Sequence, residues 1–214
     1  MSQKTENENI VFRIITLGNS GVGKTSILRR YAYEMFNEDI MTTIGVNLVF
    51  KEITLKNGKT IKLKLIDTAG QEKYKALTKS YYKNADGVFF VFAWNDPDSF
   101  ENIMNWIKEF NDNQDKRSKI NIPKYFIGNK SDLNPKDKLV TEESVKKFID
   151  ECNIEHYETT SAKDNINIKI IFQEISELIY ENYEKYCENK QKNITVGKFQ
   201  KEKGNNCGKC YSSL

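Results

Sequence analysis

Glycines, a lysine and a hydroxyl are concentrated in the segment GNSGVGKTS, residues 18–26. The segment fits the pattern Gly-x4-Gly-Lys-Ser/Thr through Gly18, Gly23, Lys24 and Thr25, between an apolar run and a predicted helix. Glycines let backbone N–H groups surround phosphate oxygens at a helix start, where the helix dipole also favours negative charge. The lysine suits the β- and γ-phosphates and the Thr25 hydroxyl suits Mg²⁺. The pattern therefore predicts a binding site for a nucleoside triphosphate.

A second motif, DTAGQE at residues 67–72, comes just after another predicted strand. An acidic side chain at this place can hold Mg²⁺ directly or through water, because a small hard cation prefers oxygen ligands and keeps its waters. Paired with the first motif, Asp67 is therefore predicted to act on the metal.

A third motif, NKSD at residues 129–132, follows the apolar run IPKYFIG and indicates which base is bound. The Asp132 carboxylate can accept hydrogen bonds from guanine N1–H and from its exocyclic amine, and adenine lacks this donor pair. Asn129 can bridge the base and the phosphate loop, and the stem of Lys130 can lie along the ring. The motif favours guanine.

These motifs need strands and helices that place them at one edge of a sheet. Apolar runs predict strands at 10–18, 46–55, 59–67, 87–94 and 124–129, and Asn57-Gly58 predicts a hairpin between the second and third runs. Helices are expected after Asp96-Pro97, after Thr141, and from Ile168 to about Tyr186. The alternation predicts an α/β fold, one doubly wound domain over residues 9–186, with ligands at the carboxyl ends of the strands.

Composition sets limits on the function. The chain has 214 residues and a net charge of +3, and six lysines against two glutamates lie from Cys187 onward, so the body is close to neutral. A near-neutral body argues against a nucleic-acid-binding surface. No apolar run approaches the length of a membrane helix, the polar start is not a signal peptide, and four scattered cysteines indicate a reducing, cytoplasmic compartment. Residues 1–8 are expected to be a flexible N-terminus and residues 187–214 a flexible, basic tail.

With these motifs in this order, residues ~10–183 resemble the small GTPases of the Ras superfamily, and most of all the Rab family. Rab-like stretches include IGVNLVF (44–50) and KLKLIDTAGQEKYKALTKSYYKNADG (62–87). The resemblance implies a mostly parallel six-stranded sheet with one antiparallel edge hairpin, and a GTP/GDP switch that needs Mg²⁺ and regulates vesicle traffic.

The resemblance also implies a role for each matching residue. Thr43 reaches Mg²⁺ and the γ-phosphate, the Gly70 N–H senses the γ-phosphate, and Gln71 orients the attacking water. The implied catalytic residues are Gln71, Lys24 and Thr43, and the implied metal ligands are Thr25, Thr43 and Asp67. The implied phosphate-binding residues are Asn19, Ser20, Gly21, Val22, Gly23, Lys24, Thr25, Ser26 and Gly70. The implied guanine-binding residues are Phe36, Asn129, Lys130, Asp132, Ser161, Ala162 and Lys163.

The expected partners follow from the same resemblance. They are a GTPase-activating protein, a nucleotide exchange factor, effectors, a prenylation escort and a GDP-dissociation inhibitor. No arginine occurs between Arg30 and Arg117, so the activating protein is expected to supply one in trans. The family's usual aromatic effector cluster is altered, since Leu48 stands for Phe and Ile66 for Trp beside Tyr81, and Ala93 replaces the usual Asp.

Two cysteines, Cys207 and Cys210, lie in the basic tail. A redox pair or a zinc site finds no support around them, and the position fourth from the end is Tyr211, so a CaaX signal is absent. In the Rab context they resemble a double geranylgeranylation site, although their spacing departs from the family's commonest endings. Lipidation would carry the protein onto the cytoplasmic face of intracellular membranes.

Two other functions compete with the switch. One is a P-loop ATPase or kinase, which Asn129 and Asp132 argue against. The other is a non-catalytic, nucleotide-locked module that recruits partners to a membrane, although Gln71, Thr43 and Ser20 show no obvious lesion.

Overall fold

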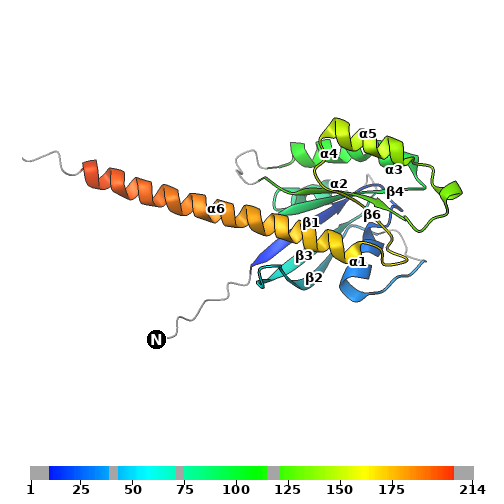
Figure 1. Ribbon diagram of the computed structural model, residues 1–214, viewed down its shortest axis with the longest axis horizontal. Coiled ribbons are helices and arrows are strands. Elements are labelled where there is room, and N and C mark those ends of the chain that lie inside the picture. Colours follow the sequence, from blue (N-terminus) through cyan, green and yellow to red (C-terminus); the bar gives the residue numbers. More distant parts are fainter. Residues whose placement is uncertain (1–9, 39–42, 71–74, 115–120, 205–214) are drawn as a thin grey trace, which may run out of the picture.

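The structure is a computed structural model that describes residues 10–38, 43–70, 75–114 and 121–204, with the backbone alone for 75–78 and 190–204. Within this part of the chain, one six-stranded sheet runs in the order β2-β3-β1-β4-β5-β6 (Figure 1). The strands are β1 (Val11–Leu17), β2 (Val46–Thr54), β3 (Thr60–Thr68), β4 (Gly87–Ala93), β5 (Lys124–Asn129) and β6 (Tyr157–Thr160). Only the β2–β3 pair is antiparallel in this sheet, which confirms the predicted mixed α/β fold.

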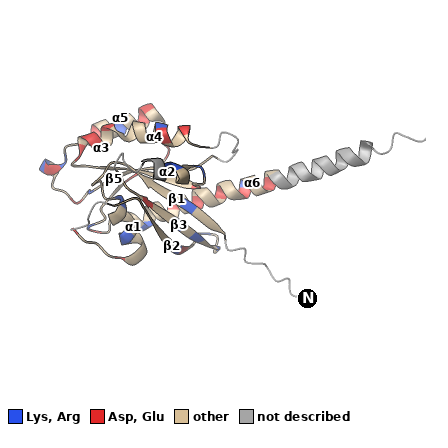
Figure 2. Cartoon of the chain, turned by 180° about the vertical axis from the view of Figure 1, so that it is seen from behind, with Lys and Arg blue, Asp and Glu red and all other residues tan. Residues whose placement is uncertain are grey.

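The helices cover both faces of the sheet (Figure 1). They are α1 (Lys24–Tyr33), α2 (Lys75–Tyr82), α3 (Pro97–Glu101), α4 (Ile103–Asp112), α5 (Glu142–Cys152) and α6 (Ile168–Gly204), with a short 3-10 turn at Pro135–Asp137. Their charged side chains lie mainly on outer surfaces, while the central strands carry few (Figure 2).

Alternating strand residues build two cores, one on each face. On β1, Ile14 packs into the core covered by α1 and α6, and Ile15 packs into the core covered by α2, α4 and α5. Every residue of β4 is buried, as expected for a central strand of a sheet that is covered on both sides. At its first residue, a β-carbon on Gly87 would lie 2.7 Å from Ile179 Cδ1, so glycine permits the close approach of α6. The two cores fix the strand ends that carry the motifs.

The predicted hairpin is confirmed, since β2 and β3 are joined at Asn57-Gly58 and Gly58 has a φ of 82°. The predicted helix starts are also confirmed. Asp96 accepts a hydrogen bond from the Ser99 N–H at 3.0 Å, and Thr141 accepts one from the Ser144 N–H at 3.1 Å.

One expected helix is interrupted, and one expectation about a helix end was wrong. The helix after Asp96-Pro97 begins as predicted, but Asn102, where ψ is −7°, separates α3 from α4. The last helix does not end near Tyr186 but continues to Gly204. Residues 187–203 contain no proline and are rich in Lys, Gln and Glu, which have high helix propensity, and the single glycine among them, Gly197, does not end the helix.

Candidate guanine-nucleotide site

The phosphate loop connects the end of β1 to the start of α1. Its glycines hold conformations that other residues rarely adopt, because Gly21 and Gly23 have φ values of 78° and 95°. Gly18 is required for a different reason, since a β-carbon there would lie 2.1 Å from the Val91 carbonyl oxygen of β4. The loop therefore lies directly against the neighbouring strand, and its backbone leads into α1 at Gly23.

Lys24 lies beneath this loop and is 5% exposed. Its Nζ donates to the carbonyl oxygens of Gly18 at 2.8 Å and Asn19 at 2.7 Å, so the ammonium is held inside the curve of the loop. Burial lowers the pKa of Lys24 to about 8, although the Asp67 carboxylate opposes this shift. A buried, partly desolvated ammonium at this place is a strong binding site for phosphate oxygens.

The side chain of Asn19 points away from the loop toward α4. Its Oδ1 accepts hydrogen bonds from Asn102 Nδ2 at 2.7 Å and from Trp106 Nε1 at 2.9 Å. Asn102 is the residue that interrupts the predicted helix. The interruption therefore places the Asn102 amide where it holds Asn19 of the phosphate loop. Sequence reasoning missed both anchors, and no local pattern marks them.

Three oxygen-bearing side chains converge beside the loop. Thr25 Oγ1 donates to Asp67 Oδ2 at 2.7 Å and lies 2.7 Å from Thr43 Oγ1, and Thr43 Oγ1 lies 3.5 Å from the same carboxylate oxygen. Asp67 is 2% exposed, and its Oδ1 has no hydrogen-bond partner among the described residues. Burial raises the pKa of the Asp67 carboxyl, against the opposing effect of the hydrogen bond from Thr25. The sequence-predicted metal residues therefore lie together.

An orphaned, buried carboxylate oxygen beside two hydroxyls fits a hard divalent cation such as Mg²⁺. No cluster of three or more His, Cys, Asp or Glu side chains that could hold a metal occurs in the described part of the chain. Any metal here would therefore take its remaining ligands from water and from phosphate oxygens, as Mg²⁺ commonly does.

Gly70 lies against the phosphate loop on the same side. A β-carbon at this position would lie 2.3 Å from the Ser20 backbone nitrogen and 2.4 Å from the Asn19 carbonyl carbon. Only glycine permits this approach of the two backbones. The next residue, Gln71, lies outside the described residues.

Asn129, at the end of β5, joins the loop to the base-binding motif. It is 2% exposed, donates from Nδ2 to the Val22 carbonyl at 2.8 Å, and accepts at Oδ1 from Thr160 Oγ1 at 3.1 Å. Lys130 follows with a φ of 67°, a left-handed conformation that turns the chain sharply out of the strand. Thr160 was not predicted as a site residue, although it directly precedes the SAK tripeptide.

Asp132 is held by the SAK loop. Ser161 Oγ donates to Asp132 Oδ1 at 2.6 Å and accepts from the Asp164 N–H at 2.9 Å, so it ties the loop after β6 to the loop after β5. Ala162 is 3% exposed, while Lys163 pairs with Glu38 at 2.8 Å on the outer surface. The two predicted base-reading loops are therefore adjacent.

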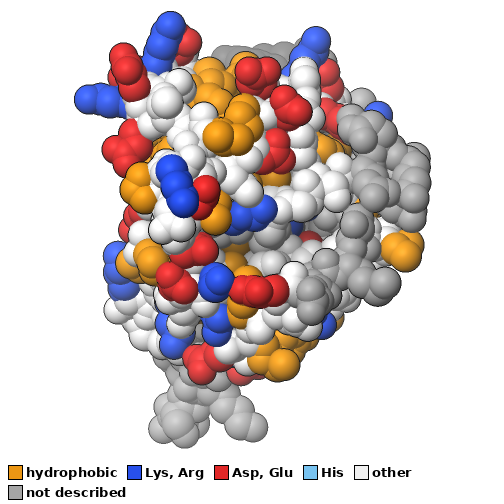
Figure 3. Space-filling view, turned by 90° about the vertical axis from the view of Figure 1, so that its right-hand side faces the viewer, with side chains coloured by type: hydrophobic (Ala, Val, Ile, Leu, Met, Phe, Trp, Pro, Cys, Tyr) orange, Lys and Arg blue, Asp and Glu red, His pale blue; other side chains and the backbone are white. Residues whose placement is uncertain are grey.

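One cleft of about 270 Å³ contacts most of these residues, and Figure 3 looks onto this end of the molecule. It is lined by Ser20, Gly21, Gly23, Lys24, Thr25, Ser26, Phe36, Asn37, Glu38, Thr43, Thr68, Gly70, Asn129, Lys130, Asp132, Leu133, Ala162 and Lys163. Asn19, Val22, Asp67 and Ser161 support the cleft from behind without lining it, and Asn37, Glu38, Thr68 and Leu133 were not predicted. The motifs thus form one elongated site at the carboxyl ends of the parallel strands.

The residues that depart from the resemblance lie outside this cleft. Leu48 of β2 is 38% exposed and is paired in register with Ile66 of β3. Ile66 is fully buried, in a core against which the partly buried Val46 and Tyr81 pack. Ala93 at the end of β4 is also buried. The structure therefore presents an aliphatic Leu48 next to the exposed Phe50 on the same face of β2.

Comparisons with known proteins agree with a guanine-nucleotide site in this cleft. The model of the Ras family matches residues 13–181. The chain is 40% identical over 172 residues to "GTP-binding protein ypt1" of Schizosaccharomyces pombe, covering 80% of this chain and 81% of that protein. It is 38% identical over 171 residues to "Ras-related protein RABD2a" of Arabidopsis thaliana, with 80% and 81% covered. The chain therefore belongs to the Ras family, as a Rab-type small GTPase.

Proposed function

We propose that this chain is a Rab-like molecular switch that binds GTP and GDP in the cleft, hydrolyses GTP and regulates vesicle traffic. The observation that carries the proposal is that one cleft is lined by Lys24 and Thr25 of the phosphate loop and by Asp132 of the base-reading motif, while Asn129 bonds the two segments together. A guanine nucleotide has phosphates at one end and a hydrogen-bonding base at the other, so its two ends match the phosphate loop and the base-reading motif.

At the phosphate end, Lys24 and the N–H groups of the glycine loop would bind the β- and γ-phosphates. Thr25, Thr43 and Asp67 would hold Mg²⁺, which supplies neutralisation of the phosphate charge when bound. The free Oδ1 of Asp67 supports this assignment, because a buried carboxylate oxygen without a partner is costly unless a ligand or water meets it.

At the base end, Asp132 would accept from guanine N1–H and the exocyclic amine, and the Ala162 N–H would donate to O6. Ser161 supports this role, because its hydrogen bond to one Asp132 oxygen fixes the carboxylate. Phe36, Lys130 and Lys163 would flank the base and ribose. Adenine would offer the partly buried Asp132 carboxylate no such pair of donors, which favours guanine.

Hydrolysis would require Gln71 to orient water and Gly70 to contact the γ-phosphate. Gly70 is already within reach of the loop backbone, which supports the second role. No arginine of the chain lies between Arg30 and Arg117, so an activating protein would supply one in trans, worth about 10³–10⁵ in rate. Exchange factors, effectors, a GDP-dissociation inhibitor and a prenylation escort would complete the cycle, as in other Rab-type proteins.

Membrane attachment would depend on Cys207 and Cys210, which lie outside the described residues. Among the described helices, none combines the length and apolarity needed to cross a bilayer. Two lipid chains on a basic tail give stable anchoring where one is marginal. We propose that the protein cycles in this way onto the cytoplasmic face of intracellular membranes.

The proposal is tested by nucleotide competition and single-turnover hydrolysis on the purified full chain. GTP and GDP are expected to displace a labelled guanine nucleotide, and ATP is not. Intrinsic hydrolysis is expected to be slow and to be stimulated by a cell extract that contains an activating protein, whereas Gln71→Leu keeps nucleotide binding and loses the stimulation. A preference for ATP would contradict the base assignment, and absence of stimulated hydrolysis in the wild type would favour the nucleotide-locked module.

A further inference from the structure

We infer that Arg30 is a positioning residue that aligns the guanine-reading loop with the cleft and so sets how long the nucleotide stays bound. The inference rests on the proposed function of the cleft. Arg30 belongs to none of the motifs, and it lies on α1, one turn after the residues that face the phosphates.

The guanidinium of Arg30 joins two segments that are far apart in the sequence. Its Nε donates to the Ala162 carbonyl at 2.8 Å and its Nη2 donates to the Lys163 carbonyl at 2.8 Å. Its Nη1 donates to the Glu34 carbonyl at 2.9 Å, where α1 ends in a left-handed residue. One planar group therefore fixes two successive carbonyls of the guanine loop and the carbonyl from which the chain leaves α1.

The next contact of Arg30 is with the residue predicted to touch the base. The Arg30 Cζ lies 5.7 Å from the centre of the Phe36 ring, within the distance at which a guanidinium and an aromatic face attract each other. Phe36 also lines the cleft and packs against the core that α1 and α6 share. Arg30 therefore contacts both walls of the base end, the Ala162–Lys163 wall and the Phe36 wall.

The other links between these two walls are weaker. Lys163 pairs with Glu38, and Lys169 pairs with Glu34 at 3.2 Å, but all four side chains are more than half exposed. Exposed ion pairs contribute little, because water and salt screen them. The three charge-assisted hydrogen bonds of Arg30 are the stronger tie, and their fork geometry cannot be reproduced by a lysine.

The consequence for binding follows from the Ala162 peptide. Its carbonyl, held by Arg30, and its N–H belong to successive peptide planes, and the Ile166 N–H holds the plane of the Ala162 N–H through the Ser161 carbonyl at 2.9 Å. With both planes held, the Ala162 N–H can be directed at guanine O6. Asp132 is fixed separately by Ser161. Loss of Arg30 should therefore weaken recognition of O6 more than recognition of the exocyclic amine.

The test compares three nucleotides on wild type, Arg30→Met and Arg30→Lys. Protein is loaded with GDP, with 6-thio-GDP, whose sulfur is a poor acceptor at position 6, or with IDP, which lacks the exocyclic amine. Dissociation is then followed after a chase with excess unlabelled GTP. Arg30→Met is expected to release GDP at least about tenfold faster, since a tenfold change is about 1.4 kcal/mol and a hydrogen bond to a charged group contributes about that much or more.

The pattern across nucleotides separates positioning from a general loss of stability. In Arg30→Met the preference for GDP over 6-thio-GDP should fall toward one, while the preference for GDP over IDP should stay near its wild-type value. Arg30→Lys should release GDP almost as fast as Arg30→Met. The matched control is Lys169→Met, which removes a cation from an exposed pair with the same Glu34 and should stay within about twofold of wild type.

The inference is wrong if Arg30→Met releases GDP at the wild-type rate, or if it accelerates release of all three nucleotides equally. Either result leaves the proposed function intact, because the wild type still binds GDP. Failure of the wild type to retain GDP at all would instead contradict the proposed function, and the inference with it.

Discussion

Gly23 and Asn129 are packed so closely that a β-carbon on Gly23 would lie 2.2 Å from Asn129 Nδ2. The same amide nitrogen donates to the Val22 carbonyl at 2.8 Å. The phosphate loop and the base-reading loop therefore touch directly through one glycine and one amide, and neither can shift without the other. A nucleotide bound in this cleft is held by a single rigid unit.

Gly23→Ala is expected to lower the affinity for GDP and GTP by at least about a hundredfold, measured by equilibrium displacement of a fluorescent nucleotide. The added carbon collides with Asn129, and a φ of 95° is strained for alanine. Gly21→Ala is the matched control, because its φ is 78° but no atom lies within 4 Å of the added carbon. Gly21→Ala should lose clearly less nucleotide affinity than Gly23→Ala. Equal losses of affinity would show that backbone strain, and not contact with Asn129, causes the effect of Gly23→Ala.

Asp67→Asn is expected to abolish the response of nucleotide release to metal removal. In the wild type, a chelator should accelerate GDP dissociation by at least about tenfold, because it would withdraw the ion that Thr25 and Asp67 are proposed to hold. In Asp67→Asn, release should already be fast and should change less than about twofold. Asp86→Asn, a partly buried carboxylate that accepts from the Arg13 N–H at 2.8 Å, should respond like the wild type. A full chelator response in Asp67→Asn would contradict the metal assignment.

Nucleotide binding is expected to take up a proton above pH 8. Burial lowers the pKa of Lys24 to about 8, and the charges of a bound phosphate beside the ammonium would raise it. The bound state then holds more protons than the free state, so GDP affinity should fall as the pH rises past 8. Calorimetry in buffers of different ionisation enthalpy should detect this proton uptake at pH 8.5. Near pH 6.5 Lys24 is charged in both states and should contribute none.

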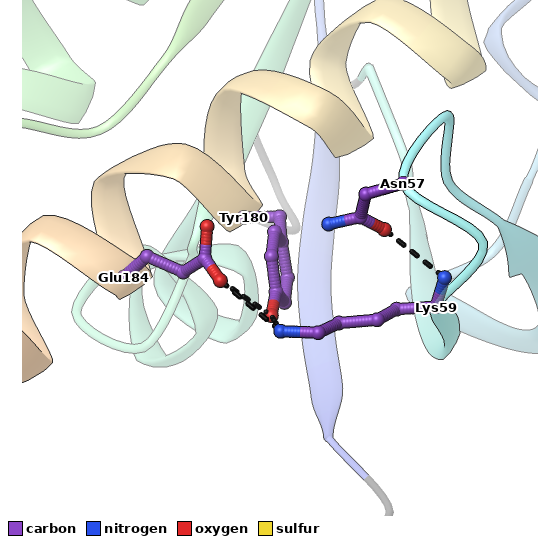
Figure 4. Close-up of polar contacts among 4 residues, drawn as sticks. All are labelled: Asn57, Lys59, Tyr180 and Glu184. Atoms are coloured by element: carbon purple, nitrogen blue, oxygen red, sulfur yellow. Dashed lines mark hydrogen bonds and ion pairs between the residues drawn. The ribbon is translucent and has the colours of Figure 1, made fainter.

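Tyr180→Phe is expected to lower the free energy of unfolding by about 1 kcal/mol, measured by urea denaturation of the GDP-loaded protein. The Tyr180 side chain is 4% exposed, and its hydroxyl joins Lys59 of the β2–β3 hairpin to Glu184 of α6 (Figure 4). The exposed Lys59–Glu184 pair at 3.1 Å does not replace this contact. Tyr186→Phe, on the same helix but 42% exposed, should be close to neutral.

Most of the sheet and of the cleft was predictable because their signals are local. A β-branched run, Asn57-Gly58, or a glycine loop after a strand each specifies its own conformation within a few residues. The parallel order then brings the carboxyl ends of the strands together. The predicted residues on these ends accordingly line one cleft or lie next to its lining, apart from Gln71, which lies outside the described residues.

What the sequence did not indicate depends on contacts between distant residues. Arg30 contacts carbonyls 132 and 133 positions away, and backbone acceptors leave no trace in the side-chain pattern. Asn102 interrupts a helix whose apolar spacing is otherwise continuous, at the place where its amide contacts Asn19. The strand β6 is only four residues long, and its sequence YETT, half-buried at its start, gives no strong apolar run.

The length of α6 has a mechanical consequence. Beyond Tyr186 the helix continues for about 27 Å, away from the end of the molecule that holds the cleft (Figure 1). A flexible segment of equal length would span a similar average distance, so reach is not what the helix adds. A flexible segment lets the domain tumble, whereas a helix behaves as a lever arm that transmits torque. Whatever binds the C-terminal end of α6 therefore fixes the orientation in which the cleft and β2 are presented to a partner protein.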